Sequence, residues 1–260
     1  MTLKEEATVA WYEHGISRIY YEEEGGGDPL LLLPGWSLSI RDLAPVRQAL
    51  APRYHVIAAD APGAGRSGPQ PRKYTASYFH DDSRAFLGLL RDLRAGPTHV
   101  VGFSDGGEYA LVMAELEPAA VRSIVAWGAA GRLAAPKELV AAFSEIVDNP
   151  IPPLQEFSGY LTSTYGKDNA RAMAQSWTKA LTEMIDAGGD ISRERAEEIA
   201  CPALLITGEN DSIAPPGVVS ELAGAMQNAD FMEAKGAGHT VHHESPDWLI
   251  ATIVAWLEKH

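Results

Sequence analysis

The most informative stretch of the chain is THVVGFSDGGEYALVMAELE, residues 98–117. Its first six residues form a short apolar run, typical of a strand buried on both faces of a parallel sheet, and residues 105–117 are expected to form a helix. The GFSDG sequence at 102–106 joins the two and fits the pattern G-x-S-x-G. A sharp strand-to-helix turn of this kind exposes a serine hydroxyl, and the flanking glycines avoid steric clashes. The stretch therefore predicts Ser104 as a nucleophile; the alternative is an ordinary helix cap.

Strands and helices are expected to alternate on both sides of this turn, because apolar runs follow amphipathic segments over most of the chain. The expected strands are 7–13, 16–23, 29–35, 54–60, 98–103, 121–127, 202–208 and 229–234. The expected helices are about 39–51, 75–94, 105–117, 216–227 and 246–258. This alternation predicts an α/β protein with a doubly wound, mostly parallel sheet and helices on both faces.

Residues 132–198 interrupt the alternation. They contain no convincing buried strand and are predicted to form short helices, broken by NPIPP at 149–153 and by two glycines at 188–189. We interpret this segment as a helical cap inserted over the sheet. The core that contains the sheet would then comprise residues 1–131 and 199–260.

Composition limits the partners of the protein. The 260 residues carry a formal net charge of −14, which repels phosphate backbones and argues against a nucleic-acid partner. A chain of this length can bury a core without disulfides, and Cys201 is its single cysteine. No secretory leader is visible, and no apolar run reaches the ~18 residues of a membrane span. We therefore expect a cytoplasmic protein with no membrane partner; the oligomeric state is open.

A serine nucleophile needs a base, and the base needs a group that orients it. In folds with this motif the chain order is nucleophile, acid, histidine. The strand at 202–208 runs directly into Glu209-Asn210-Asp211, so Asp211 should emerge at the carboxyl edge of the sheet. Glu209 and Asp190 are weaker alternatives.

The base is expected in the GAGH sequence at 236–239, because two glycines give the loop the freedom to return His239 to the serine. His242 and His243 are close competitors. The remaining histidines are expected on strands, helices or the terminus away from this edge: His14, His55, His80, His99 and His260.

An oxyanion hole should use two backbone N–H groups. One belongs to Asp105 at the start of a helix, and the other belongs to Trp36, after the strand at 29–35. The indole of Trp36 either lines the acyl pocket or packs against the cap. The side chains expected to contact substrate are Trp36, Phe103, Asp105, Trp127, Tyr160 and Trp177.

Two other patterns are interpreted as structural. DAPGAGRSG at 60–68 has neither phosphate-loop sequence, and a tight turn in which Asp60 binds local amides is favoured. His242-His243-Glu244 lacks the spacing of a zinc-binding helix. We therefore expect no metal and no cofactor.

The ordered motifs GFSDG, GENDSIAP and GAGH, together with DAPGAGRSG, resemble the α/β-hydrolase superfamily from about residue 29 to the end. Within it, LLLPGW, GFSDGG, VAWGAA and CPALLITGEND are similar to the valacyclovir-hydrolase (biphenyl hydrolase-like) group. The resemblance implies an α/β-hydrolase fold with a cap after WGAA, a triad of Ser104, Asp211 and His239, oxyanion amides at Trp36 and Asp105, and no cofactor.

The same resemblance implies a function for the Asp105 carboxylate, namely recognition of the α-amino group of amino-acid esters. The alternative is an acidic residue favoured only by the helix dipole. The expected activity is hydrolysis of small-molecule carboxylic esters through an acyl-enzyme. Lactone opening, carbon–carbon bond hydrolysis and perhydrolysis use the same triad, and a ligand-binding receptor with vestigial turnover is a further alternative.

Overall fold

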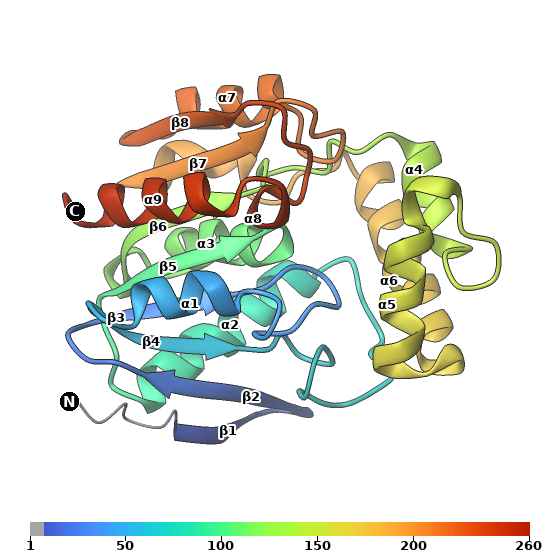
Figure 1. Cartoon of the computed structure of the whole chain (residues 1–260), viewed down its shortest axis with the longest axis horizontal. Helices are drawn as coiled ribbons and strands as arrows, with labels where there is room; N and C mark the ends of the chain where they lie inside the picture. Colours follow the sequence, from blue (N-terminus) through green and yellow to red (C-terminus); the bar gives the residue numbers. More distant parts are fainter. Residues whose placement is uncertain (1–7) are drawn as a thin grey trace.

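The computed structural model describes residues 8–260, in which eight strands form a mixed sheet with helices on both faces (Figure 1). The strand order is β1-β2-β4-β3-β5-β6-β7-β8. The pairs β1–β2 and β2–β4 are antiparallel, and the other pairs are parallel. The strands are β1 (Thr8–His14), β2 (Ser17–Glu24), β3 (Asp28–Leu33), β4 (Tyr54–Ala59), β5 (Thr98–Phe103), β6 (Val121–Trp127), β7 (Ala203–Gly208) and β8 (Ala229–Ala234). The predicted doubly wound, mostly parallel sheet is confirmed, although residue 7 of the first expected strand lies outside the described residues.

Two layers of helices cover this sheet. The core helices are α1 (Ala44–Leu50), α2 (Tyr78–Asp92), α3 (Asp105–Leu116), α7 (Pro216–Ala225), α8 (Val241–Glu244) and α9 (Pro246–Leu257), with a 3-10 turn at Pro118–Ala120. Buried side chains of α2, α3 and α7 pack with one face of the sheet, and those of α1 and α9 pack with the other. Both faces of the central strands are therefore covered.

The central strands are apolar throughout because both of their faces are buried. In β3, Leu31 and Leu33 join the cluster under α2 and α3, whereas Leu30 and Leu32 join the cluster under α1 and α9. All four leucines are fully buried. Each such side chain contributes about 1.5–3 kcal/mol relative to an exposed one, so the continuous runs in the sequence are the main source of the core's stability.

The start of α1 differs from the sequence prediction. A helix over about 39–51 was expected, but the regular helix begins at Ala44. The Asp42 carboxylate accepts hydrogen bonds from the Ser39 N–H at 2.7 Å and the Ser39 hydroxyl at 3.0 Å. This local turn competes with helical hydrogen bonds, and Pro45 in the first turn then starts the helix.

The expected helical insertion is present. It contains α4 (Lys137–Ser144), α5 (Gln155–Tyr165) and α6 (Lys167–Asp186), with 3-10 helices at Pro152–Leu154 and Arg193–Glu198. In Figure 1 these three helices lie beyond the end of the sheet toward which the parallel strands point, so they face the carboxyl ends of those strands. We call the segment 132–198 the cap.

A narrow stem joins the cap to the core. The Gly131 carbonyl accepts the N–H groups of Ile191, Ser192 and Arg193 at 3.0, 2.8 and 2.9 Å, so the outgoing and returning chains are held together. The buried Glu108 carboxylate of α3 accepts the Gly131 N–H at 3.2 Å. The base of the cap is therefore attached to the same helix that follows Ser104.

The loop after β4 is structural, as predicted. The Asp60 carboxylate is 1% exposed and accepts the N–H groups of Ile40 at 2.7 Å and Arg66 at 2.8 Å. Burial raises the pKa of Asp60 to about 6, against the opposing effect of these two hydrogen bonds. Asp60 therefore holds two loops together at the carboxyl end of the sheet.

Candidate active site

Ser104 occupies the sharp turn between β5 and α3. Its φ of 53° and ψ of −119° lie in a sparsely populated region, which costs ~1–3 kcal/mol for a residue with a side chain. A Cβ on Gly102 would lie 2.2 Å from the Gly106 carbonyl oxygen, and a Cβ on Gly106 would lie 2.2 Å from the Leu33 carbonyl oxygen. Both positions require glycine, which is the steric reason for the motif.

The three residues predicted as a triad lie in one hydrogen-bonded row. His239 Nε2 is 3.1 Å from the Ser104 Oγ, and His239 Nδ1 is 2.8 Å from an Asp211 carboxylate oxygen, Oδ2. Ser104 follows β5, Asp211 follows β7, and His239 lies in the loop after β8. Parallel strands bring these three loops together because their carboxyl ends meet at one edge of the sheet.

Asp211 is fixed and remains charged. Its Oδ1 accepts the N–H groups of Ile213 at 2.8 Å and Ala214 at 2.9 Å, which leaves Oδ2 for His239. Burial alone would raise the pKa of Asp211, but the hydrogen bonds from His239 and these two amides outweigh it and lower the pKa. The carboxylate therefore accepts a hydrogen bond from the Nδ1–H of His239, and Nε2 is left to accept a proton from Ser104.

Within residues 8–260, none of the competing acids and bases is hydrogen-bonded to Ser104, although His242 and His243 line the same cavity. Glu209 is exposed and accepts the Gly236 N–H, and the exposed Asp190 accepts the Glu194 N–H at the cap stem. His242 is buried, and its Nδ1 is 3.3 Å from the indole nitrogen of Trp127. His243 is exposed. Neither of these histidines is hydrogen-bonded to Ser104 in the described part of the chain.

The N–H groups of Trp36 and Asp105 are the candidates for an oxyanion hole. Asp105 is the first residue of α3, so its N–H precedes the first hydrogen bond within the helix. Apart from bonds within helices and strands, no backbone hydrogen bond is donated by the N–H of Trp36 or Asp105 within residues 8–260. An oxyanion hole requires backbone N–H groups without such a partner.

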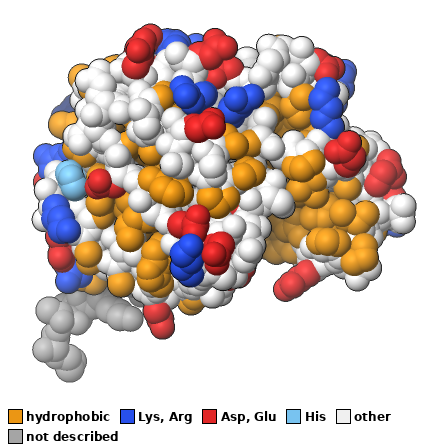
Figure 2. All heavy atoms as spheres, turned by 90° about the horizontal axis from the view of Figure 1, so that it is seen from above, with side chains coloured by type: hydrophobic (Ala, Val, Ile, Leu, Met, Phe, Trp, Pro, Cys, Tyr) orange, Lys and Arg blue, Asp and Glu red, His pale blue; other side chains and the backbone are white. Residues whose placement is uncertain are grey.

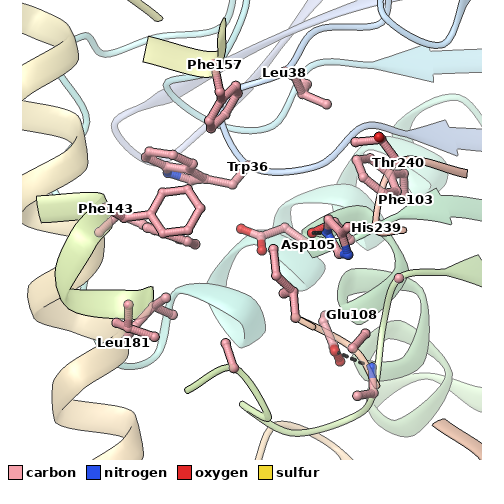
Figure 3. A pocket seen from close by; sticks show the side chains of 18 of the residues that line it. Trp36, Leu38, Phe103, Asp105, Glu108, Phe143, Phe157, Leu181, His239 and Thr240 are labelled. Carbon is pink, nitrogen blue, oxygen red and sulfur yellow. Dashed lines mark hydrogen bonds between the residues drawn. The ribbon is translucent and has the colours of Figure 1, made fainter. Parts of the chain in front are cut away.

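A cavity of about 500 Å³ opens between the cap and the core, with Ser104 and His239 among its lining residues. Most of the wall is apolar; the aromatic lining residues are Trp36, Phe79, Phe103, Phe143, Phe157, Tyr160 and Trp177. Figure 2 shows hydrophobic side chains gathered around a recess at this junction. Figure 3 shows the Asp105 carboxylate directed toward the space next to Trp36 and Phe143.

The sequence left open whether the Trp36 indole lines the pocket or packs against the cap, and in the structure it does both. Its side chain lines the cavity and also packs on the cap, where it stacks on Trp177 with the ring centroids 4.1 Å apart. Phe143 and Phe157 of the cap approach the same indole edge-on. Trp36 therefore joins the loop after β3 to the cap.

Trp127 was expected to contact substrate, and this prediction is wrong. The last residue of β6 is 0% exposed, does not line the cavity, and packs in the cluster on the α1 and α9 face of the sheet. Its ring lies 5.7 Å from that of Phe103, with Phe103 itself on the cavity wall. The other expected contact residues, Phe103, Asp105, Tyr160 and Trp177, do line the cavity.

Sequence reasoning missed two buried polar residues near the cavity. Glu108 lines it, and burial raises the pKa of this carboxyl to about 8 against the hydrogen bonds from Ala130 and Gly131. The Tyr78 hydroxyl donates to Asp105 Oδ2 at 3.0 Å. The position of Glu108 in the first helical turn after the G-x-S-x-G motif could have indicated its place, because that turn faces the site. Nothing in the sequence around Tyr78 indicated its place.

Asp105 lies at the cavity wall, and the residue is 6% exposed. Burial raises its pKa to about 7, although the hydrogen bond from Tyr78 and the charge of Arg72 act in the opposite direction. A cationic group in the cavity would favour the charged carboxylate.

Within residues 8–260, no group of three or more His, Cys, Asp and Glu side chains is placed to hold a metal ion. None of the helices in this range combines the length and apolar character that crossing a bilayer demands.

Comparison with known proteins agrees with the fold. The sequence profile of the Alpha/beta hydrolase family matches residues 30–252. Human serine hydrolase BPHL is 28% identical over 236 residues, which cover 86% of this chain and 74% of the relative. A pimeloyl-[acyl-carrier protein] methyl ester esterase of Nitrosospira multiformis is 26% identical over 267 residues, covering 92% of this chain and 98% of the esterase.

Among solved structures, the enol-lactonase from Burkholderia xenovorans LB400 is similar to this chain, with a TM-score of 0.76 and 23% sequence identity. The match covers 96% of this chain and 100% of the lactonase. At this identity the likeness concerns the fold alone.

Proposed function

The chain belongs to the alpha/beta hydrolase family, and from this premise we propose that it is a serine hydrolase that cleaves carboxylic esters through an acyl-enzyme. The hydrogen-bonded row from Ser104 through His239 to Asp211 is the observation that carries the proposal. A hydroxyl, an imidazole and an ionised carboxylate in this order are the groups that acyl transfer requires. The esterase and serine hydrolase among the relatives support the same class of reaction.

In the proposed acylation step, His239 Nε2 takes the Ser104 proton while Oγ attacks the ester carbonyl. The charge that develops on the carbonyl oxygen is stabilised by the N–H groups of Trp36 and Asp105. Asp211 holds the imidazole in the required tautomer and stabilises the imidazolium that forms. His239 then donates the proton to the departing alcohol, which leaves an ester on Ser104.

Deacylation repeats these steps with water as the nucleophile. His239 takes a proton from water, the resulting tetrahedral intermediate uses the same two amides, and the proton returns to Ser104 as the acid product leaves. The largely apolar cavity supports an acyl group with a hydrophobic side chain, because seven aromatic residues line it.

The finer part of the proposal concerns the substrate. We assign Asp105 the role of binding the α-amino group of an amino-acid ester. Its carboxylate follows Ser104 directly in the chain and lines the cavity. An ammonium beside the acyl carbon would form a charge-assisted hydrogen bond with it.

Asp105→Asn is expected to lower kcat/KM for an α-amino ester by about 10- to 150-fold relative to the matching ester without the amino group. The substitution retains the shape and the backbone N–H but removes the negative charge that favours the ammonium. The measurement is kcat/KM for the p-nitrophenyl esters of phenylalanine and of 3-phenylpropionate, in wild type and variant. Parallel losses on both substrates would assign Asp105 to the turn alone and contradict the amino-ester assignment.

The pH dependence of the same two substrates provides a second readout. Because the pKa of Asp105 is raised to about 7, its carboxylate gains charge as the pH rises from about 5 to about 7. The ratio of the two kcat/KM values should therefore rise over this range in the wild type. His239 acts on both substrates in the same way, so its contribution to the rate cancels in the ratio. The rise should be absent in Asp105→Asn.

The reaction class is tested by a substrate panel. The panel contains α-amino, N-acylated and simple alkyl esters, a lactone and a vinylogous 1,5-diketone. Highest kcat/KM on the open-chain esters supports the proposal. Preference for the lactone or the diketone would replace it with lactone opening or carbon–carbon bond hydrolysis, both of which are possible with the same triad.

Phe157→Ala in the cap is expected to change the relative kcat/KM for long and short acyl groups by about 10-fold. Phe157 lines the cavity and contacts Trp36 edge-on, so truncation enlarges the acyl site without touching the triad. The measurement is a series of p-nitrophenyl esters from acetate to octanoate. Phe231→Ala in β8 is the matched control, because Phe231 does not line the cavity. Equal losses for every ester in Phe157→Ala would make Phe157 structural.

A further inference from the structure

The Asp105 carboxylate is held at one oxygen and open at the other. Oδ2 accepts the Tyr78 hydroxyl at 3.0 Å. Within residues 8–260, no hydrogen bond or ion pair joins Oδ1 to another side chain, and the carboxylate faces the cavity (Figure 3). A carboxylate with one bound and one free oxygen has a fixed direction toward a ligand.

The proton of the Tyr78 hydroxyl is directed by the cap. The Trp177 indole nitrogen, which can only donate, lies 3.1 Å from the Tyr78 oxygen. The Tyr78 oxygen therefore accepts from Trp177, and its single proton is left for Asp105. Burial keeps the pKa of Tyr78 well above its ordinary value, so the hydroxyl remains a donor.

The charged groups around Asp105 are bonded to other residues, so the hydrogen bond from Tyr78 is the direct contact that holds its carboxylate in the described part of the chain. Arg72, whose charge acts on Asp105, is committed to Asp82 through two hydrogen bonds of 2.7 Å. Glu108 is occupied by the amides of the cap stem, and His239 is occupied by Ser104 and Asp211. No lysine or arginine is therefore paired with Asp105 in the described part of the chain.

Trp177 also contacts the other residue that supplies an oxyanion amide. Its ring stacks on Trp36 with an interplanar angle of 15°. One side chain of α6 thus reaches Trp36 by stacking and Asp105 through Tyr78. The position of the cap and the direction of the Asp105 carboxylate are joined by these contacts.

We propose that Tyr78 is a positioning residue that orients the Asp105 carboxylate toward the substrate ammonium, and that Trp177 of the cap directs the Tyr78 hydroxyl for this role. The inference rests on the proposed amino-ester function and adds two residues that determine substrate preference. Tyr78 does not take part in the proton transfers at Ser104.

The test is Tyr78→Phe, assayed with the phenylalanine and 3-phenylpropionate esters. Removing the hydroxyl frees Asp105 Oδ2 and its rotamer, so KM for the α-amino ester should rise and the ratio of the two kcat/KM values should fall about 10-fold. The increase should be mainly in KM, since the groups that transfer protons are not altered. Trp177→Phe, which retains a ring against Trp36 but removes the N–H, should lower the ratio in the same direction by a smaller factor.

Tyr54→Phe is the matched control. Tyr54 is a buried tyrosine at the start of β4, at the opposite end of the sheet from Ser104, and its ring packs on His99. This variant should retain the wild-type ratio. Thermal unfolding of all three variants checks that each is folded at the assay temperature.

The outcomes separate this inference from the proposed function. An unchanged ratio in Tyr78→Phe, or equal losses on both esters, together with a selective loss in Asp105→Asn, would overturn the role of Tyr78 and leave the amino-ester function intact. If Asp105→Asn is itself unselective, the amino-ester function fails first. A lowered ratio in both Tyr78→Phe and Trp177→Phe supports the inference.

Discussion

Replacing Ser104 by alanine is expected to lower kcat for a p-nitrophenyl ester by about 10⁴- to 10⁶-fold. The variant lacks the oxygen that would form the acyl-enzyme, so only the oxyanion amides and the cavity remain to accelerate direct attack by water. The measurement is steady-state turnover, with protein concentration high enough to detect the residual rate. Ser220→Ala, at an exposed serine of α7, is the matched control and should retain wild-type turnover.

The fold should survive this substitution. Within residues 8–260 the Ser104 side chain makes one hydrogen bond, to His239, and alanine fits the same space. The circular dichroism spectrum and the unfolding midpoint should therefore stay close to the wild type. A folded Ser104→Ala variant that retains more than about one tenth of wild-type kcat would contradict the assignment of Ser104.

His239→Ala should lower kcat by a similar factor, about 10⁴- to 10⁶-fold, because no other imidazole is hydrogen-bonded to Ser104 in the described residues. His242→Ala should lower kcat far less. Its main effect should be on stability, since it leaves the buried Trp127 indole N–H without an acceptor at a cost of about 1–3 kcal/mol. Turnover and urea unfolding of both variants measure the two effects.

A reversed order of severity would contradict this assignment. If His242→Ala abolished turnover while retaining the fold, and His239→Ala were mild, the base would be His242. Exogenous imidazole provides an additional check, because it should restore part of the activity of His239→Ala when it occupies the space left by the ring. It should not restore activity to Ser104→Ala.

Much of the core could be predicted because its signals are local. A strand buried on both faces must be apolar at every position, and β3, β5 and β7 appear in the sequence as short continuous apolar runs. Gly102 and Gly106 could be assigned a steric role because the turn around Ser104 brings backbone atoms together within one motif. Parallel strands then place the loops after β7 and β8 at the same edge.

The orientation of individual side chains depends on contacts distant in the sequence, and it was predicted less well. Trp127 ends a strand with two buried faces, so its sequence context could not show which face its side chain occupies. Tyr78 was one aromatic among several in a helix of the expected length; its role depends on α3 and on a cap residue 99 positions away. Helix α1 began late because the side chain of Asp42 formed a turn with Ser39.

The cap illustrates the same limit. Its helical character followed from the absence of strand-like runs between 132 and 198, but the aromatic contacts between Trp36 and Trp177 join segments from two different layers. Periodicity within either segment does not specify such a pair. The sequence therefore predicted that a cap was present, whereas its contact with the loop after β3 required the structure.

The central claim is that turnover proceeds through an ester on Ser104, and trapping that ester tests it most directly. The protein is quenched in acid during turnover of a slowly hydrolysed p-nitrophenyl ester, digested, and examined by mass spectrometry. We expect an added acyl mass on the peptide that contains Ser104, at up to one acyl group per chain, and none in Ser104→Ala. Turnover with no acyl group on Ser104, or an acyl group on another residue that persists in Ser104→Ala together with the activity, would contradict the account.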